Sequence, residues 1–162
     1  INDDNSMLDC RIKGLEKKTP DLIILDRKLK LKKNLKLYKK IKNRKILLFT
    51  CFNNRKKISF LKRKGIKVYM FNSLNEKKDM NALFFILKKK GYSRILIESG
   101  LTLINFLLIN KFLKFIYIFK SNSKLGKYGL NYSSSRYIKK INLKNLIKVN
   151  LFGDKLYREK LK

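Results

Sequence analysis

The sequence predicts an α/β fold, in which a mostly parallel sheet is flanked by helices and followed by a C-terminal antiparallel hairpin. Short apolar runs alternate with helical segments as far as residue 120, a rhythm typical of parallel strands joined by helices. Beyond that residue the alternation stops, and residues 145–161 have the pattern of two strands about a Gly–Asp turn. With 162 residues, 44% of them apolar, the chain can bury one core, so we expect a single domain over residues 1–162.

The first half of the chain contains three predicted strands and one basic helix. Residues 20–26 (PDLIILD) form a short apolar run after a proline, and residues 45–50 (KILLFT) form a second such run. Residues 55–65 (RKKISFLKRKG) predict a basic helix that ends at its final glycine. Residues 66–71 (IKVYMF) predict the third strand.

Residues 75–91 predict an amphipathic helix. Met80, Leu83, Phe84 and Leu87 follow one another at the i, i+3, i+4 and i+7 spacing that places side chains on one helix face. Acidic residues come early in the segment and lysines late, which complements the helix dipole, and a glycine closes it. We expect the apolar stripe to pack in the core.

The second half of the chain predicts two more strands, a helix, a loop and the hairpin. Residues 94–99 (RILIES) predict a fourth strand, residues 101–112 a helix, and residues 114–120 (KFIYIFK) a fifth strand. Residues 121–135 are polar and contain two glycines, so we expect a loop before the hairpin at residues 145–161.

The net charge of +31 has two interpretations. Lys and Arg number 42 against 11 Asp and Glu, a balance typical of nucleic-acid-binding proteins. The lysines are also spread over the whole length, and the dominance of Lys, Ile, Asn, Leu, Phe and Tyr is what AT-rich codons produce. We favour the compositional interpretation and expect no nucleic-acid partner; a basic nucleic-acid-binding protein without enzymatic activity is the alternative. A steep loss of nucleic-acid affinity with salt would support that alternative.

The residue inventory excludes several kinds of chemistry. The chain has no histidine and only two cysteines, Cys10 and Cys51, which lie far apart in the sequence. We therefore expect no metal site, no histidine general base and no Ser–His or Cys–His hydrolase. Two cysteines form no disulfide framework, so a reducing cytoplasm is the expected compartment. No apolar stretch reaches about 18 residues without a charge, so we expect no membrane span.

The junction at Glu98–Ser99–Gly100 is the most informative site candidate. A strand that turns directly into a helix leaves backbone N–H groups pointing out of the helix start, where anions and phosphates bind. Gly100 would let a phosphate approach the backbone closely, and Thr102 could donate its hydroxyl. An ordinary strand–helix turn is the alternative, because the glycine spacing is not that of a dinucleotide-binding fingerprint. The carboxyl end of the second strand, at Thr50, is another candidate.

The N-terminal stretch carries a family resemblance. Residues 4–11 (DNSMLDCR) resemble the D-N-P-x-L-[TN]-x-R motif of the reductase domain in the bifunctional riboflavin-biosynthesis deaminase/reductase. Residues 94–108 (RILIESGLTLINFLL) are similar to that family's I-L-[VI]-E-G-G-x-x-L-x-x-x-L-L segment. TPDLIILDRKLKL, KLGKYGL (124–130) and LFGDKLY (151–157) resemble further family segments in the same order.

The resemblance implies a dihydrofolate-reductase-like fold and an NADPH-dependent reductase. The implied reaction reduces 5-amino-6-(5-phosphoribosylamino)uracil to the ribitylamino product, by hydride transfer to C1 of the opened ribose. Such a step needs orientation more than a strong acid or base, so we assign no catalytic residue. Family likeness also implies a homodimer. The family's domain begins with a further strand and helix ahead of residue 4, and we expect the chain to be a piece of a longer protein.

Individual roles follow from the resemblance. Leu8, Arg11 and Glu98 match substrate-binding positions, and the guanidinium of Arg11 suits the substrate phosphate. Asp4 matches an NADP position, and Thr50 lies where a strand end could meet the nucleotide. The segment matching the NADP diphosphate loop comprises Gly100, Leu101, Thr102, Leu103, Ile104, Asn105 and Phe106.

The chain also departs from the family pattern at positions beside these residues. Ser6 replaces the usual proline, Asp9 replaces Thr or Asn, and Ser99 replaces the first glycine of the pair. The first change removes a fixed φ from the loop, and the second sets a negative charge near Arg11. A related reductase on the same fold with another pterin-like or pyrimidine substrate is a further alternative, against which the resemblance in the spacing of Asp4, Leu8 and Arg11 argues.

Overall fold

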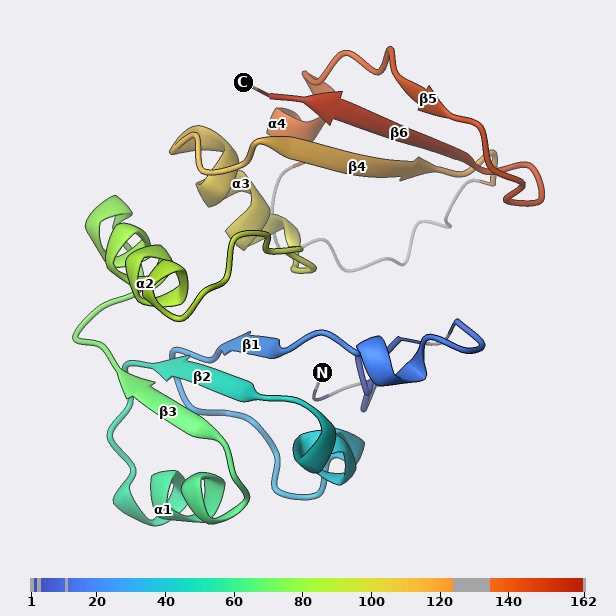
Figure 1. Ribbon diagram of the computed structural model, residues 1–162. Helices are drawn as coiled ribbons and strands as arrows, with labels where there is room; N and C mark the ends of the chain where they lie inside the picture. The colour runs from blue at the N-terminus through green and yellow to red at the C-terminus, as the bar shows by residue number, and fades with distance from the viewer. Residues whose placement is uncertain (1, 3, 11, 124–134, 162) are drawn as a thin grey trace. The chain divides into compact units, whose positions relative to one another are not determined.

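The computed structural model describes residues 2, 4–10, 12–123 and 135–161 (Figure 1). The chain divides into two compact units, Ile1–Tyr92 and Ser93–Lys162. The single domain expected over residues 1–162 stays a prediction. No helix among the described residues is long and apolar enough to cross a bilayer.

A parallel sheet forms the centre of the first unit. It contains β1 (Leu22–Leu25), β2 (Ile46–Thr50) and β3 (Lys67–Met70), in the order β1-β2-β3. Leu22 pairs with Ile46 in the first ladder and Leu47 with Lys67 in the second, both parallel. All five residues of β2 are buried, as expected for a central strand covered on both faces. The predicted α/β class and its first three strands are confirmed.

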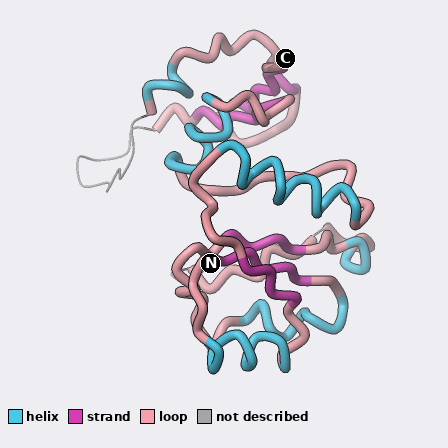
Figure 2. The backbone as a smooth tube through the Cα atoms, turned by 90° about the vertical axis from the view of Figure 1, so that its left-hand side faces the viewer, coloured by secondary structure: helices cyan, strands magenta, loops and turns pink. Residues whose placement is uncertain are grey.

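Helices cover both faces of this sheet (Figures 1 and 2). The 3-10 helix η2 (Lys36–Asn43) and α1 (Arg55–Arg63) lie on one face, and α2 (Lys77–Lys89) lies on the other. Alternate residues of β2 point to opposite faces, so the strand contributes to two apolar layers. The layer beneath α1 and η2 includes Ile24, Leu37, Ile46, Leu48 and Leu61. The other layer contains Leu47, Phe49, Met80, Leu83 and Leu87, all at most 2% exposed.

Local sequence signals set the ends of α1 and α2. The Asn54 side chain accepts a hydrogen bond from the Lys57 amide at 2.9 Å and caps the start of α1. A capping box between Glu76 and Asp79 begins α2. Gly65 follows α1 with φ of +90°, in the left-handed region that glycine tolerates. The predicted basic helix and the predicted amphipathic helix are therefore confirmed.

The described part of the second unit contains an antiparallel sheet and two helices. α3 (Leu101–Ile109) precedes β4 (Phe115–Lys120), and α4 (Arg136–Lys139) precedes β5 (Leu146–Ile147) and β6 (Lys155–Lys160). The strand order is β4-β6-β5. β5 and β6 pair antiparallel, which confirms the predicted C-terminal hairpin. Most of the predicted loop lies outside the described residues, as does the KLGKYGL segment.

Two strand predictions need correction. Residues 92–100 have no regular secondary structure, so the strand predicted at 94–99 is wrong. An apolar run becomes a strand only where a neighbouring strand supplies backbone hydrogen-bond partners, and no described strand pairs with residues 94–99. Leu96 in this segment is 76% exposed. The strand predicted at 114–120 does form, but it pairs antiparallel with β6. The strands therefore build two separate three-stranded sheets where the sequence had indicated one extended sheet.

The hydrogen bonds of Glu159 on β6 predict that the stability of the second unit depends on pH. The buried carboxylate accepts hydrogen bonds from the backbone amides of Asn145 and Lys144, at 2.7 and 2.6 Å, and from the Asn145 side chain at 2.7 Å. These bonds, the Asn145 amide first, hold the pKa of Glu159 below its ordinary value.

A lowered folded-state pKa stabilises the protein above the unfolded-state pKa, and this contribution is lost as the pH falls through the folded-state value. We expect Glu159→Gln to be less stable than the wild type near neutral pH, with the difference shrinking below about pH 4. Urea denaturation of both proteins across the acidic range measures this. A difference that stays constant with pH would mean that the carboxylate is not charged in these bonds.

Candidate functional site

The start of α3 exposes backbone amides that no side chain caps. Gly100 is the N-cap residue, with φ of −69° and ψ of 165°, and the structure shows no side-chain hydrogen bond there. The first turn of α3 contains no acidic residue, whereas side chains cap both α1 and α2. A helix start of this kind offers free N–H groups and a partial positive charge to an anion.

Gly100 leaves open space in front of these amides. A Cβ built on Gly100 would meet no atom within 4 Å, and the backbone conformation is one that any residue adopts. Neither crowding within the unit nor backbone geometry therefore requires glycine here. Glycine at this position would, however, allow a ligand to approach the backbone closely.

The seven residues predicted for the cofactor segment differ in what they can offer a ligand. The amides of Leu101, Thr102 and Leu103 precede the first intrahelical hydrogen bond, which the Ile104 amide donates to the Gly100 carbonyl at 3.3 Å. Thr102 is exposed, whereas Asn105 is buried with 8% exposure. Ile104, Asn105 and Phe106 continue the helix, so their amides are occupied within it.

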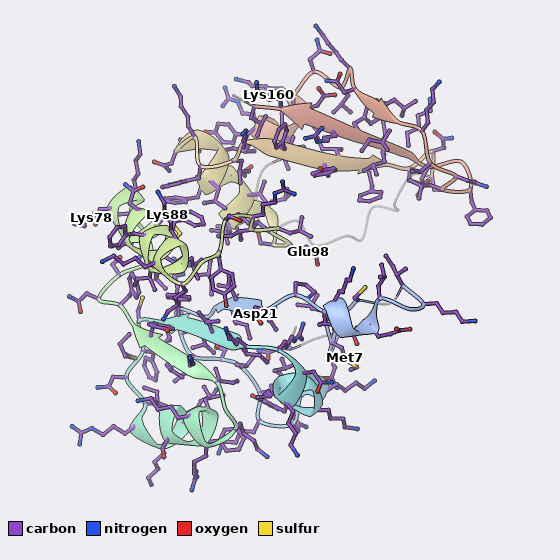
Figure 3. The ribbon with its side chains drawn as sticks, in the orientation of Figure 1. Met7, Asp21, Lys78, Lys88, Glu98 and Lys160 are labelled. Carbon is purple, nitrogen blue, oxygen red and sulfur yellow. The ribbon has the colours of Figure 1, made fainter. Side chains whose placement is uncertain are left out.

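Glu98 lies two residues before the N-cap, on the irregular segment that leads into α3. Its side chain is exposed (Figure 3), and Ser99 and Gly100 beside it are exposed as well. The Ser99 hydroxyl donates a weak hydrogen bond to the Gly100 carbonyl at 3.4 Å. The junction that the sequence singled out is therefore accessible from Glu98 to Thr102, although an irregular segment, and not a strand, precedes it.

In the first unit, hydrogen bonds hold the segment that carries Asp4 and Leu8. The Asp4 carboxylate accepts from the Ser6 amide at 3.2 Å, and the Asn5 side chain accepts from the Lys36 amide at 2.8 Å. Asn5 and Leu8 both adopt left-handed backbone conformations, with φ of 48° and 49°. Arg11, the predicted phosphate ligand, lies outside the described residues.

Arg44 contacts this segment, and the sequence analysis did not single it out. Its guanidinium donates hydrogen bonds to the carbonyls of Met7 and Leu8, and its side chain is only 6% exposed. Burial lowers the pKa of Arg44, while the nearby carboxylates of Asp9 and Asp21 oppose that shift. One arginine inside a lysine-rich stretch gives no sequence signal that would distinguish it.

Thr50 occupies a different part of the first unit. It is fully buried, and its hydroxyl donates to the Arg27 carbonyl at 3.4 Å and accepts from the Phe52 amide at 3.3 Å. Thr50 ends β2, whereas Arg44, which binds Leu8, precedes the start of that strand. The length of a five-residue strand, roughly 16 Å, separates those ends, so the structure does not bring Thr50 beside Leu8.

A shallow hollow lies where β3 ends and α2 begins, and it contains none of the predicted site residues. Its volume is about 590 Å³. Its lining residues are Met70, Phe71, Asn72, Ser73, Glu76, Lys78, Asp79, Ala82 and Ile86. Asp4, Leu8 and Thr50 belong to the first unit, and Glu98 and residues 100–106 belong to the second. The predicted site residues are therefore distributed over both units.

The described residues have an α/β fold with a three-stranded parallel sheet and a separate antiparallel sheet, which agrees with the dihydrofolate-reductase-like class of the family that the chain matches. Residues 1–145 match the family model described as the RibD C-terminal domain. The match covers most of the chain, so the chain belongs to this family, which comprises the reductase domains of riboflavin biosynthesis. The chain is therefore an oxidoreductase domain of that pathway. No curated protein matches the sequence.

Proposed function

We propose that this domain reduces 5-amino-6-(5-phosphoribosylamino)uracil to its ribitylamino product with NADPH. The observation that carries the proposal is the uncapped, open start of α3, which matches the diphosphate of a dinucleotide in charge and in hydrogen-bonding need. Family membership supports the pathway and the reaction class. NADPH supplies the hydride, and a solvent proton completes the two-electron reduction of the opened ribose.

The protein's own residues bind and orient the two ligands. The amides of Leu101, Thr102 and Leu103 donate to the diphosphate, and the bare Cα of Gly100 lets it approach. Glu98, exposed just before this turn, accepts hydrogen bonds from ribose hydroxyls of the substrate. Hydride transfer of this kind needs orientation more than a strong acid or base, so we assign the rate enhancement to orientation, which agrees with a chain that lacks histidine.

The decisive assay follows NADPH absorbance in the protein expressed from its complete gene. We expect NADPH oxidation only when the phosphoribosylamino-pyrimidine is present, with stoichiometric formation of the ribitylamino product. No oxidation, or equal oxidation without the pyrimidine, would refute the proposed reaction. Oxidation with a different pyrimidine or a pterin alone would assign the domain to a related reductase.

Gly100→Val tests the cofactor site within the same assay. The added Cβ meets no protein atom within 4 Å and the residue needs no special backbone angle, so we expect the helix start to lose at most about 1 kcal/mol. It occupies the space in front of the α3 amides, so we expect the KM for NADPH to rise roughly 10-fold or more. The KM for the pyrimidine should change little. An unchanged KM for NADPH would show that the diphosphate binds elsewhere.

A further inference from the structure

We propose that Arg44 is a positioning residue, which holds the turn at residues 4–8 in the conformation that substrate binding requires. The proposal rests on the proposed function and on the substrate-binding role that the family resemblance implies for Leu8. The structure supplies the hydrogen bonds, the burial and the backbone geometry that support it. Arg44 touches neither ligand in this scheme and acts through the backbone of Met7 and Leu8.

The two hydrogen bonds fix the turn to the sheet. Arg44 lies between η2 and β2, and the amide of the next residue, Lys45, donates to the Asp21 carboxylate at 2.8 Å. The Lys45 carbonyl accepts from the Leu22 amide at 2.9 Å, so the backbone beside Arg44 is tied to β1. Its planar guanidinium then reaches two successive carbonyls, those of Met7 and Leu8. Figure 3 labels Met7 and Asp21 in this region.

The turn needs such support because its backbone is strained. Asn5 and Leu8 adopt left-handed angles, which are unfavourable for non-glycine residues and persist only where surrounding contacts impose them. Asn5 is held by its bond with the Lys36 amide. Leu8 is held through its carbonyl by Arg44. Ser6, unlike a proline, places no restriction of its own on the chain between them.

The burial of Arg44 distinguishes it from the other cations of this chain. Of the basic side chains that the structure describes, Arg44 is the one that is buried. Its Nε is buried as well and has no hydrogen-bond partner among the described residues. A buried charge with an unsatisfied N–H is poor for stability, and an apolar side chain of similar volume often does as well or better. Its value therefore lies in where it places the two carbonyls.

Lysine cannot reproduce this arrangement. The guanidinium is a rigid planar fork that donates in two parallel directions, whereas an ammonium group is a compact point charge on a flexible stem. The carboxylates of Asp9 and Asp21 would still attract a lysine here. Lysine would therefore keep the charge and lose the two-carbonyl geometry, which makes Arg44→Lys the informative conservative variant.

The test uses the protein expressed from its complete gene, with Arg44→Met, Arg44→Lys and, as a matched control, Arg63→Met on the exposed end of α1. We expect Arg44→Met to raise the KM for the phosphoribosylamino-pyrimidine about 10-fold, with kcat within about twofold. Arg44→Lys should raise the KM by a smaller factor, and Arg63→Met should not change it. If Arg44→Met does not fold, Arg44→Lys carries the test alone.

Amide hydrogen exchange of residues 4–10 provides a readout that does not depend on activity. We expect faster exchange there in Arg44→Met, with β2 still protected. A lower melting temperature with unchanged KM and unchanged exchange at residues 4–10 would overturn the proposal, leaving Arg44 a purely structural residue. Should the wild type not reduce the pyrimidine, the proposed function fails. The exchange result then still decides whether Arg44 holds the turn.

Discussion

Replacing Arg11 with alanine is expected to raise the KM for the phosphorylated substrate by roughly 10- to 150-fold, the equivalent of a lost charge-assisted hydrogen-bonding pair. A guanidinium binds a phosphate through two parallel hydrogen bonds, and alanine removes both of them. Turnover at saturating substrate should change far less, because the phosphate is remote from the carbon that is reduced. Steady-state kinetics with varied pyrimidine and saturating NADPH measure both parameters.

Three controls separate this role from the general attraction of a +31 chain for anions. Lys13→Ala removes a nearby exposed cation and should leave the KM nearly unchanged. Arg11→Lys keeps the charge without the fork and should give an intermediate KM. A substrate analogue that lacks the phosphate should bind wild type and Arg11→Ala about equally. If Arg11→Ala weakens both substrates by the same factor, Arg11 does not bind the phosphate.

The first unit was predictable because its local and tertiary signals agree. β2 is uniformly apolar and lies at the centre of the sheet, and the stripe of Met80, Leu83 and Leu87 faces the core. Asn54 and the Glu76–Asp79 capping box begin their helices at positions that sequence alone indicates. Consistency across these levels is what lets a sequence specify a structure. The 3-10 helix η2 was not predicted, because lysines interrupt its short apolar pattern.

The segment at 94–99 shows that an apolar run in the sequence is not sufficient to predict a strand. Its apolar run has the composition of a buried strand, but a strand also needs a partner with free backbone groups. β4 satisfies that need with β6 in an antiparallel ladder, and residues 94–99 have no such partner among the described strands. Strand propensity is a local property, whereas strand pairing is decided by the whole chain.

In the candidate site, too, local features could be predicted from the sequence and tertiary contacts could not. The open turn at Gly100 could be predicted, because a glycine at a helix start and the absence of a capping side chain are both legible in the sequence. Arg44 could not, because burial and a bond to residues 36 or more positions earlier depend on tertiary structure. Thr50 was placed correctly at a strand end, but its hydroxyl is occupied by its own unit's backbone.

Phe49→Ala is expected to lower the free energy of unfolding of the first unit by about 3–5 kcal/mol, which is a large share of the stability of a small domain. Phe49 is fully buried on β2. Its ring stacks on Tyr69 with centroids 4.9 Å apart and meets Phe71 edge-on at 5.8 Å. Alanine would leave a cavity between the central strand β2 and helix α2. Urea denaturation followed by circular dichroism measures the loss.

Phe85→Ala is the matched control, because the same atoms are removed from α2 at a position that is 57% exposed. The Phe85 ring contacts the Lys89 ammonium at 4.7 Å, a surface interaction whose loss should cost no more than about 1 kcal/mol. Phe49→Leu, which keeps most of the volume, should lie between the two variants. Equal effects of Phe49→Ala and Phe85→Ala would mean that α2 does not cover this face of the sheet.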